Sequence, residues 1–504
     1  MHIPLVHQSK RDQSNPDETR AFALRQREHI LARWGSKNNA AANEARAAIR
    51  KRQTIGLQDY GTDSSYYGQV SVGTPKQNFN VVLDTGSSDF WLATTDCTSS
   101  ECDSATLFNP ASSSSYHSGS TPFQIQYGTG AVAGTLVADD VSLAGYVVND
   151  LTWANVDQVA SGTLTPGSSG IMGMGFEELA ESKTTPFWQV LVEQNLLKTN
   201  VFSFQLSRAP TTATSATFSP GGVFTLGQLD GNQYSGDISF VNVVGNDGFW
   251  SIPLDAITVN GNTATLSSGN TAAIDTGTTL ISMPNSVLEQ VFSQIPGATP
   301  TQMSSSSEGF YSIPCSSSNI ISLRFGGKDY TISAQDLLAG RLSYSSCLAA
   351  LFSLDLGDSG PDYVVGDTFL KNVFTAFQYS PAAVGFAALK DSSGAQTVAT
   401  SSGVVGSAAA TATSAVSSAS SVSSAITGVP GLPSVSSNTA TTSASTNVVG
   451  ASGLPQPSAI STSQTAAPTL QAAGSGSSSS FASPRAPLLF SLALAALFAF
   501  AFAL

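Results

Sequence analysis

Short apolar runs separated by turn residues dominate the chain between residues 66 and 389. Val, Ile, Phe and Thr are concentrated in these runs, and Gly, Ser, Asn and Asp fill the gaps between them. This alternation is typical of β-strands joined by turns. Only residues 186–197 and 284–295 have the apolar spacing expected of helices. The pattern therefore predicts an all-β body that contains two helices.

The regions on either side of this body have a different composition. Residues 38–50 are rich in Ala with interspersed charges, which indicates a helix or a flexible segment. Residues 392–475 consist mainly of Ser, Thr, Ala and Val, with almost no charge or aromatic side chain. Such a composition cannot bury a core and is typical of a disordered, glycosylated stalk. The chain has no Asn-X-Ser/Thr sequence, so we expect any sugar to be O-linked.

The C-terminal residues 487–504 form a nearly uninterrupted apolar run. This run follows small residues at 474–480 and a short polar spacer, which is the arrangement of a glycosylphosphatidylinositol (GPI) attachment signal. We therefore predict such a signal at residues 476–504 and a lipid anchor to the membrane. A retained transmembrane span is the alternative, although the run lacks the usual basic residues behind it.

Charge is divided unevenly along the chain. Residues 1–52 have a net charge of +6, residues 53–391 have a net charge of −20, and Arg485 is the single charged residue after them. A strongly acidic body is a poor partner for nucleic acid and is suited to acid conditions. The basic segment ends in the pair Lys51 and Arg52, which we interpret as a processing site, with a solvated charge cluster as the alternative.

All four cysteines lie in the acidic body, at positions 97, 102, 315 and 347. Four thiols permit three pairings, of which the most local joins Cys97 to Cys102 and Cys315 to Cys347. The body has no Cys-X-X-Cys and one histidine, His117, which we interpret as a solvated loop residue. We therefore expect no metal site, and the cysteines favour an oxidising compartment.

One short phrase occurs twice in the body. Asp-Thr-Gly-Ser begins at Asp84 and Asp-Thr-Gly-Thr begins at Asp275, and each follows an apolar run. About ninety residues after each aspartate, a second apolar run ends in a glycine, at Gly173 and at Gly366. The repeat indicates the duplication of a half-domain.

Duplication gives the two aspartates a joint chemistry. Two related lobes that face each other bring the same loop to a shared interface, so Asp84 and Asp275 are expected to meet. Close carboxylates share one proton, so one can polarise a carbonyl while the other takes a proton from water. The glycines at 86 and 277 are expected to let the backbone turn sharply. The hydroxyls of Ser87 and Thr278 are expected to orient the acids.

These motifs resemble those of the pepsin-like aspartic proteases, family A1, over residues 66–389. The stretch "YYGQVSVGTPKQNFNVVLDTGSSDFWL" is similar to the first strands and first catalytic loop of the family, and "FQIQYGTGAVAGTL" is similar to its flap hairpin. The stretch "TTPFWQVLVEQNLL" resembles the helix that follows the first lobe's closing loop in this family. The stretch "AAIDTGTTLI" resembles the second catalytic loop, and "YVVGDTFLKNVFTAFQ" resembles the second closing loop. With the C-terminal signal, the chain resembles the GPI-anchored type of this family found in fungi.

The resemblance implies an all-β, bilobal fold with a catalytic pair, Asp84 and Asp275, at the floor of a long cleft. It implies that the ring N–H of Trp91 supports Tyr127, that both local disulfides form, and that no cofactor is needed. Ser87 and Trp91 would support the site from behind. The residues implied to contact substrate are Tyr127, Gly128 and Thr129 in the flap, and Gly86, Gly277 and Thr278 beside the acids.

The sequence thus predicts a monomeric aspartic endopeptidase that cleaves protein or peptide substrates at acid pH and is tethered at the cell surface. We expect an inhibitory pro-segment at 1–52, lobes at 53–232 and 233–391, the stalk at 392–475 and the attachment signal. No signal peptide is visible, so we expect the true start to lie upstream of Met1. The alternative is an inactive cell-surface peptide-binding protein with the same fold, which loss of an Asp or of the flap Tyr would favour; neither is lost.

Overall fold

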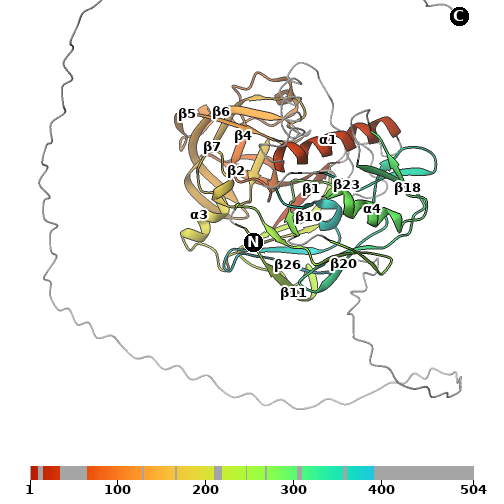
Figure 1. Ribbon diagram of the computed structural model, residues 1–504. Coiled ribbons are helices and arrows are strands. Elements are labelled where there is room, and N and C mark those ends of the chain that lie inside the picture. Colours follow the sequence, from red (N-terminus) through yellow and green to blue (C-terminus); the bar gives the residue numbers. More distant parts are fainter. Residues whose placement is uncertain are drawn as a thin grey trace, which may run out of the picture. The chain divides into compact units, whose positions relative to one another are not determined.

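Figure 1 shows the computed structural model of the chain. It describes residues 2–8, 15–34, 65–127, 130–164, 167–208, 218–245, 247–266, 270–303, 309–354, 356 and 360–390, with residues 2–8, 32, 218 and 219 described by their backbone. The chain divides into a unit of residues 1–407 and a unit of residues 408–504, and all described residues belong to the first. The predicted features outside the described residues are Gly128, Thr129, Lys51, Arg52, the helix expected at 38–50, the stalk and the attachment signal.

Strands are the main regular secondary structure of the described body, as the hydrophobic pattern predicts. The largest sheet has thirteen strands, in the order β11 (Tyr234–Asn242), β26 (Ala383–Leu389), β25 (Phe374–Gln378), β9 (Val201–Leu206), β10 (Phe218–Leu226), β1 (His2–Gln8), β2 (Tyr66–Val72), β3 (Gln77–Asp84), β8 (Gly170–Gly173), β4 (Phe90–Ala93), β7 (Tyr146–Val159), β6 (Ala131–Leu143) and β5 (His117–Gln126). Strand β1 pairs with both β10 and β2, so the N-terminal segment is an internal strand of this sheet.

The duplication seen in the sequence also governs the strand pairing. In the first half β3 pairs parallel with β8, β8 antiparallel with β4, and β4 parallel with β7. A five-stranded sheet has the order β12 (Ser251–Pro253), β15 (Thr271–Ile274), β24 (Tyr363–Val365), β16 (Ile281–Met283) and β23 (Leu351–Ser353). In it β15 pairs parallel with β24, β24 antiparallel with β16, and β16 parallel with β23. The same sequence of pairings in both halves confirms the predicted all-β, bilobal fold.

Two four-stranded sheets complete the described second half. One has the order β14 (Asn262–Ala264), β13 (Ala256–Val259), β19 (Ile321–Phe325) and β20 (Lys328–Ile332). The other has the order β17 (Thr299–Thr301), β18 (Phe310–Pro314), β22 (Ser346–Ala349) and β21 (Leu338–Arg341).

The two helices predicted for the body are present and shorter than predicted. They are α3 (Phe187–Glu193) and α4 (Asn285–Ser293), and each begins directly after a proline. The prediction missed α5 (Asp367–Leu370), which is a single turn with all four residues buried and is too short to show a helical period. Three 3₁₀ helices also lie in the body: η2 (Ser100–Ser104), η3 (Pro110–Ser112) and η4 (Glu177–Leu179).

A long helix in the basic N-terminal segment, α1 (Pro16–Trp34), is absent from the predicted elements. The Asn15 side chain caps it by accepting a hydrogen bond from the backbone N–H of Asp17 at 3.0 Å, and Pro16 occupies the first helical position. Acidic residues in the first turn and a basic one in the last complement the helix dipole. The helix escapes prediction because its buried face mixes apolar residues such as Ile30 with the polar residues His29 and Arg33.

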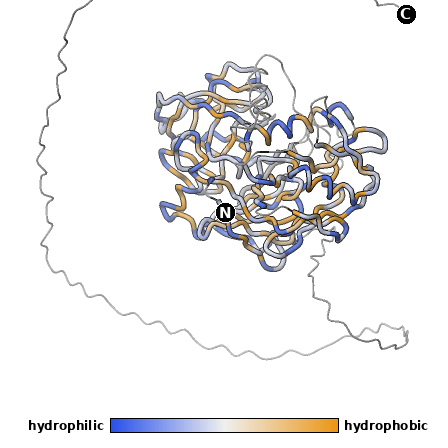
Figure 2. Tube along the Cα trace, viewed as in Figure 1, coloured by the Kyte–Doolittle hydropathy of each residue, from blue (hydrophilic) through white to orange (hydrophobic). Residues whose placement is uncertain are grey.

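An aromatic cluster joins the two halves. The rings of Trp188 and Trp250 lie 5.7 Å apart, and Phe202 packs against both. Their buried indole N–H groups are satisfied, because Trp250 donates to Met174 O at 2.9 Å and Trp188 to Gly175 O at 3.0 Å. Hydrophobic and hydrophilic stretches alternate along the strands in Figure 2, as expected where one side of each strand faces this core.

Candidate active site

The two predicted catalytic carboxylates occupy equivalent places in the duplicated sheets. Asp84 is the last residue of β3 and pairs with Gly173 of β8, and Asp275 directly follows β15 and donates its N–H to Val365 O of β24 at 3.0 Å. Their exposed fractions are 2% and 0%. Equivalent strand ends thus deliver two buried carboxylates to the junction of the halves.

Each aspartate is held by its own loop in the same way. The glycine two residues later donates its backbone N–H to one carboxylate oxygen, and the hydroxyl of the next residue donates to the other. The distances to Asp84 are 3.0 Å from Gly86 N and 2.5 Å from Ser87 Oγ, and those to Asp275 are 2.8 Å from Gly277 N and 2.6 Å from Thr278 Oγ1. The hydroxyls of Ser87 and Thr278 thus each hold one oxygen of the neighbouring carboxylate.

The expected sharp turns are present at both glycines, because Ser87 N donates to Asp84 O and Thr278 N donates to Asp275 O, each at 3.3 Å. The two glycines are also required for a second reason. A Cβ on Gly277 would lie 2.2 Å from Asp84 Oδ1, and a Cβ on Gly86 would lie 2.7 Å from Asp275 Cγ. Neither glycine is among those with positive φ. The glycines therefore provide the space that lets each loop approach the opposite carboxylate.

Thr85 and Thr276 link the two loops across the junction and are not among the predicted site residues. Thr85 N donates to Thr276 Oγ1 at 3.1 Å, and Thr276 N donates to Thr85 Oγ1 at 3.0 Å. Each hydroxyl donates in turn to a carbonyl of the other half, Ile274 O at 2.8 Å and Leu83 O at 2.6 Å. The repeated Asp-Thr-Gly phrase was the signal for this pair, because the threonine is repeated with the aspartate.

Arg33 of α1 reaches into the site and contacts both carboxylates. Its Nη2 lies 2.9 and 2.8 Å from the two oxygens of Asp84, its Nη1 lies 3.3 Å from Asp275 Oδ2, and its Nε donates to Gly86 O at 2.8 Å. The side chain is 7% exposed. Burial lowers the pKa of Arg33, but Asp275 and Asp84 outweigh burial and raise it, so the guanidinium stays charged.

The pKa values of the two acids are displaced in opposite directions. Burial raises the pKa of Asp275 to about 6, with the Asp84 charge adding to the increase and Arg33 opposing it. Burial also acts to raise the pKa of Asp84, but Arg33 and the Ser87 hydrogen bond outweigh burial and lower it. The pair therefore favours an ionised Asp84 beside an Asp275 that readily holds a proton.

Tyr127 and Trp91 form the contact that the resemblance implies. The Trp91 ring N–H donates to the Tyr127 hydroxyl at 2.6 Å, and both side chains are buried. Burial, with the charges of Asp89 and Asp84, raises the pKa of Tyr127 well above its ordinary value, so its hydroxyl stays neutral and keeps a proton to donate. Tyr127 N donates to Gly130 O at 2.7 Å, which closes the hairpin between β5 and β6.

Both disulfides implied by the resemblance are present. Cys97 pairs with Cys102 in the first half, and Cys315 pairs with Cys347 in the second. The two pairs are separated by 5 and 32 residues along the chain, so each closes a loop within its own half.

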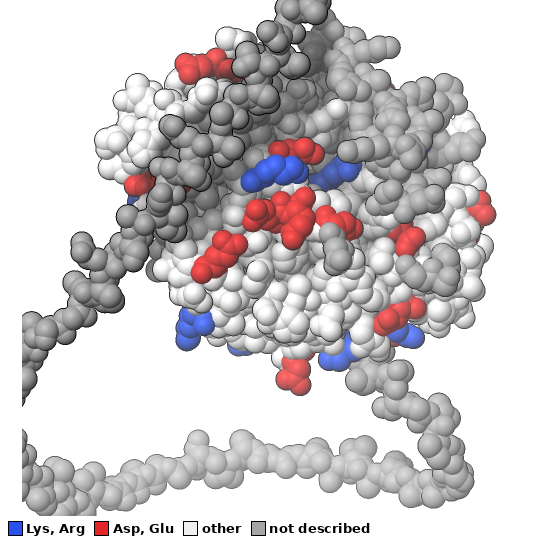
Figure 3. All heavy atoms as spheres, turned by 60° about the vertical axis from the view of Figure 1, so that its left-hand side comes forward, with Lys and Arg blue, Asp and Glu red and all other residues white. Residues whose placement is uncertain are grey.

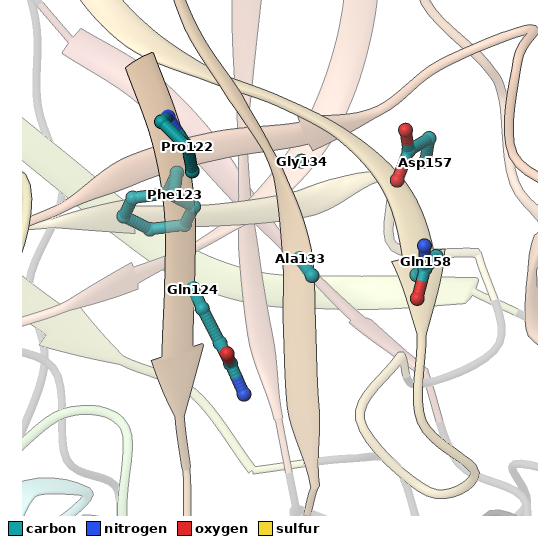
Figure 4. Close-up of a pocket in the computed structure, with 7 residues that line it drawn as sticks. All are labelled: Pro122, Phe123, Gln124, Ala133, Gly134, Asp157 and Gln158. Carbon is teal, nitrogen blue, oxygen red and sulfur yellow. The ribbon is translucent and has the colours of Figure 1, made fainter. Parts of the chain in front are cut away.

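A hollow of about 320 Å³ lies on the strands β5, β6 and β7, and none of the predicted site residues lines it (Figure 4). Ala133 and Gly134 on the central strand leave room between the larger side chains of the outer strands. A Cβ on Gly134 would lie 2.0 Å from Asn155 O, so the close approach of β7 requires a glycine there. The hollow is a consequence of strand packing.

His117 is also near this outer region and corrects an expectation. It is the first residue of β5 rather than part of a loop. Its side chain is 69% exposed and lies 2.8 Å from Asp150 Oδ1.

Acidic side chains are spread over the face drawn in Figure 3, where a group of basic side chains lies beside a group of acidic ones. The described part of the chain contains no cluster of three or more His, Cys, Asp or Glu residues that could hold a metal ion. Within the same residues, no helix has both the length and the apolar character needed to cross a membrane.

Comparisons with known proteins agree with this geometry. A family model described as "Eukaryotic aspartyl protease" matches residues 65–389. The chain is 36% identical to "Major aspartyl peptidase 1" of Cryptococcus neoformans var. grubii serotype A over 70% of this chain and 74% of the relative. It is 34% identical to cathepsin D of Gallus gallus, over 66% and 82% of the two chains, and 33% identical to cathepsin E of Aquarana catesbeiana, over 64% and 79%.

The chain therefore belongs to the pepsin-like aspartic proteases, family A1. It is an aspartic endopeptidase, and proteins of this class act on protein or peptide substrates.

Proposed function

We propose that Asp84 and Asp275 form the catalytic pair of this endopeptidase and that it works at acid pH. The observation that carries the proposal is that one guanidinium contacts both carboxylates, which places them within reach of a single small group. A water molecule bound between the two carboxylates, in the place of the guanidinium, would be within reach of both.

The reaction needs one ionised and one protonated carboxylate, and two close carboxylates that share one proton supply both once Arg33 has left the site. The ionised carboxylate, Asp84, takes a proton from water as the water oxygen attacks the peptide carbonyl carbon, and the protonated Asp275 donates to the carbonyl oxygen. The tetrahedral intermediate then collapses: its C–N bond breaks, the leaving nitrogen takes a proton from Asp84, and a hydroxyl proton returns to Asp275. The glycine N–H groups and the hydroxyls of Ser87 and Thr278 hold both acids in place throughout.

Tyr127 is proposed to close over the substrate from the hairpin between β5 and β6, together with Gly128 and Thr129. Its neutral hydroxyl, supported by Trp91, has a proton available for a group of the substrate. Gly86, Gly277 and Thr278 are proposed to contact the substrate backbone beside the acids.

We also propose that residues 1–52 are an inhibitory pro-segment. Arg33 occupies the place where the water and the peptide carbonyl would bind, because it takes both oxygens of Asp84 and one of Asp275. The +6 charge of the segment against the −20 charge of the body favours this closed state. Cleavage after Lys51 and Arg52 would make release permanent.

The location of the enzyme is a further part of the proposal. Membership in this family is consistent with the secretory pathway, and the two disulfides agree with it. We propose that a stalk at 392–475 and a lipid anchor attached through 476–504 tether a monomeric enzyme at the plasma membrane or cell wall. Lobes at 53–232 and 233–391 remain the proposed division of the protease.

The test is hydrolysis of denatured globin at about pH 4, with and without pepstatin, a general inhibitor of aspartic proteases. We expect cleavage that pepstatin abolishes. Folded protein that binds peptides without cleaving them, after removal of residues 1–52, would instead favour the inactive peptide-binding alternative.

A further inference from the structure

A buried histidine lies one helical turn before the arginine that contacts the catalytic pair. His29 is 8% exposed, and neither of its ring nitrogens has a hydrogen-bond partner among the described residues. Residues four apart lie on the same face of a helix, so His29 shares the cleft-facing side of α1 with Arg33. A neutral imidazole without partners is tolerated there, whereas a buried imidazolium would carry an unpaired charge.

The charges around His29 oppose its protonation on balance. Burial, together with the Arg33 charge on the same helix, lowers the pKa of His29 to about 3, although Asp84 at the end of β3 acts in the opposite direction. Asp275, after β15, is engaged by Arg33, and Tyr127 of the β5–β6 hairpin is neutral. Among the described residues, both carboxylates of the catalytic pair are therefore engaged by Arg33 and do not pair with His29 in the closed state.

We propose that His29 is the proton sensor of the pro-segment: protonation of its buried ring drives α1, and Arg33 with it, out of the active site. This inference rests on the proposed function, in which residues 1–52 hold the protease closed. It assigns the response to acid to one side chain of the pro-segment. A general loss of negative charge on the body would instead spread that response over many carboxylates.

The direction of the pH effect follows from the two states of α1. Released from the cleft, His29 regains a pKa of about 6.5, so the open state binds more protons than the closed state between about pH 6.5 and 3. Each pH unit in this window therefore shifts the equilibrium toward the open state by up to about tenfold. Acidification opens the cleft, and the closed state is favoured above the window.

The other ionisable groups at the contact between α1 and the active site either titrate at lower pH than His29 or contribute little to the pH dependence of opening. Arg33 remains charged throughout, because its pKa is raised. Asp84 keeps its charge in the closed state because its pKa is lowered, so it takes up protons on release only under more acid conditions. Asp275 already holds a proton below about pH 6 in the closed state, and the pair shares one proton in the open state too.

Other features of α1 are consistent with a contact that is built to be released. Thr19 Oγ1 and Trp34 Nε1 are also buried without a hydrogen-bond partner among the described residues. Trp34 packs its ring 4.0 Å from that of Phe249 in the second half. The contact thus relies on apolar packing and the Arg33 ion pairs, while several polar groups of the helix gain nothing from it.

The test measures opening of the intact chain with fluorescently labelled pepstatin between pH 4 and 7, at times too short for the pro-segment to be cleaved. His29→Gln and His29→Phe both remove the titrating ring and keep a side chain of similar size. His117→Gln on β5 is the matched control, because it makes the same chemical change at an exposed site. His2 and His7 of β1 stay unchanged in every variant.

We expect the wild type to bind the probe increasingly as the pH falls below about 6.5, and His117→Gln to follow it. At pH 5, relative to pH 7, both His29 variants should remain about 25-fold more closed than the wild type. Variants that follow the wild-type profile would overturn the proposal, and so would variants already open at pH 7, because His29 would then be a packing residue. If wild-type protein binds the probe at pH 4 yet cleaves no globin, the proposed function fails instead.

Discussion

The loops that carry Asp84 and Asp275 are built alike but have different surroundings. Each carboxylate accepts one backbone N–H and one hydroxyl from its own loop, and the threonines between them exchange matching hydrogen bonds. Arg33, however, gives Asp84 two contacts, at 2.9 and 2.8 Å, and Asp275 one, at 3.3 Å. The pKa of Asp84 is lowered and that of Asp275 is raised to about 6.

The halves differ again seven residues after each aspartate. The first half has Trp91, whose ring N–H holds the Tyr127 hydroxyl, and the second half has Ser282 at the equivalent position of β16, also buried. The duplicated fold therefore supplies a symmetric pair of carboxylates. Arg33 of α1, which contacts Asp84 more closely than Asp275, makes the two acids unequal.

The largest expected effect comes from removing either acid. Asp84→Asn or Asp275→Asn keeps the side-chain volume and removes the shared proton site, so we expect hydrolysis of globin at about pH 4 to fall about 10³-fold or more, with the fold retained. Asp157→Asn on β7 is the matched control and should keep full activity. Pepstatin-sensitive cleavage in either acid variant at the wild-type rate would contradict a two-carboxylate mechanism.

The second prediction concerns the asymmetric cation. Arg33→Gln leaves Asp84 without its charge partner in the closed state, so we expect the closed state to lose about 3–5 kcal/mol. Because the pKa of Asp84 is lowered in the closed state, Asp84 stabilises that state at pH values above its open-state pKa. This stabilisation is lost as the pH falls, and it should be absent from the variant at every pH. The intact variant should therefore cleave more globin at pH 6 than the intact wild type, which is still largely closed there.

Arg20→Gln provides the control for this change. Arg20 lies on the same helix but is 45% exposed and pairs with Asp17, so its loss should leave latency unchanged. Equal latency in wild type and Arg33→Gln would show that Arg33 does not hold the cleft closed.

The difference between the halves also marks what the sequence could predict. The β pattern, the duplication and the hydroxyls of Ser87 and Thr278 were readable, because each leaves a local or repeated signal. The helix α1 was not, because the burial of His29 and Arg33 depends on carboxylates distant in the chain. The close approach of Gly86 and Gly277 to the opposite carboxylates was not readable for the same reason: the steric limit comes from the opposite half.

The third prediction tests the symmetric part of the site. Thr85→Val and Thr276→Val each remove a buried hydroxyl that accepts one hydrogen bond and donates another across the junction. We expect each variant to lose about 2–4 kcal/mol of unfolding free energy in urea, because its partners are left unsatisfied. Thr121→Val, at an exposed position of β5, should lose little. Losses that differ by more than about 1 kcal/mol between the two would contradict an equivalent role.

The smallest effect is expected where the halves differ most, at Trp91. Trp91→Phe keeps an aromatic ring but removes the N–H that donates to the Tyr127 hydroxyl at 2.6 Å, so the tyrosine loses the bond that orients it over the acids. We expect kcat/KM to fall about tenfold, equivalent to about 1.4 kcal/mol, the size of one hydrogen bond. Trp153→Phe makes the same change at a buried indole whose N–H has no partner among the described residues, so it should affect unfolding rather than kcat/KM. An equal loss of activity in both variants would contradict this prediction. It would mean that ring packing supports the hairpin, and that the Trp91 hydrogen bond does not distinguish the first half from the second.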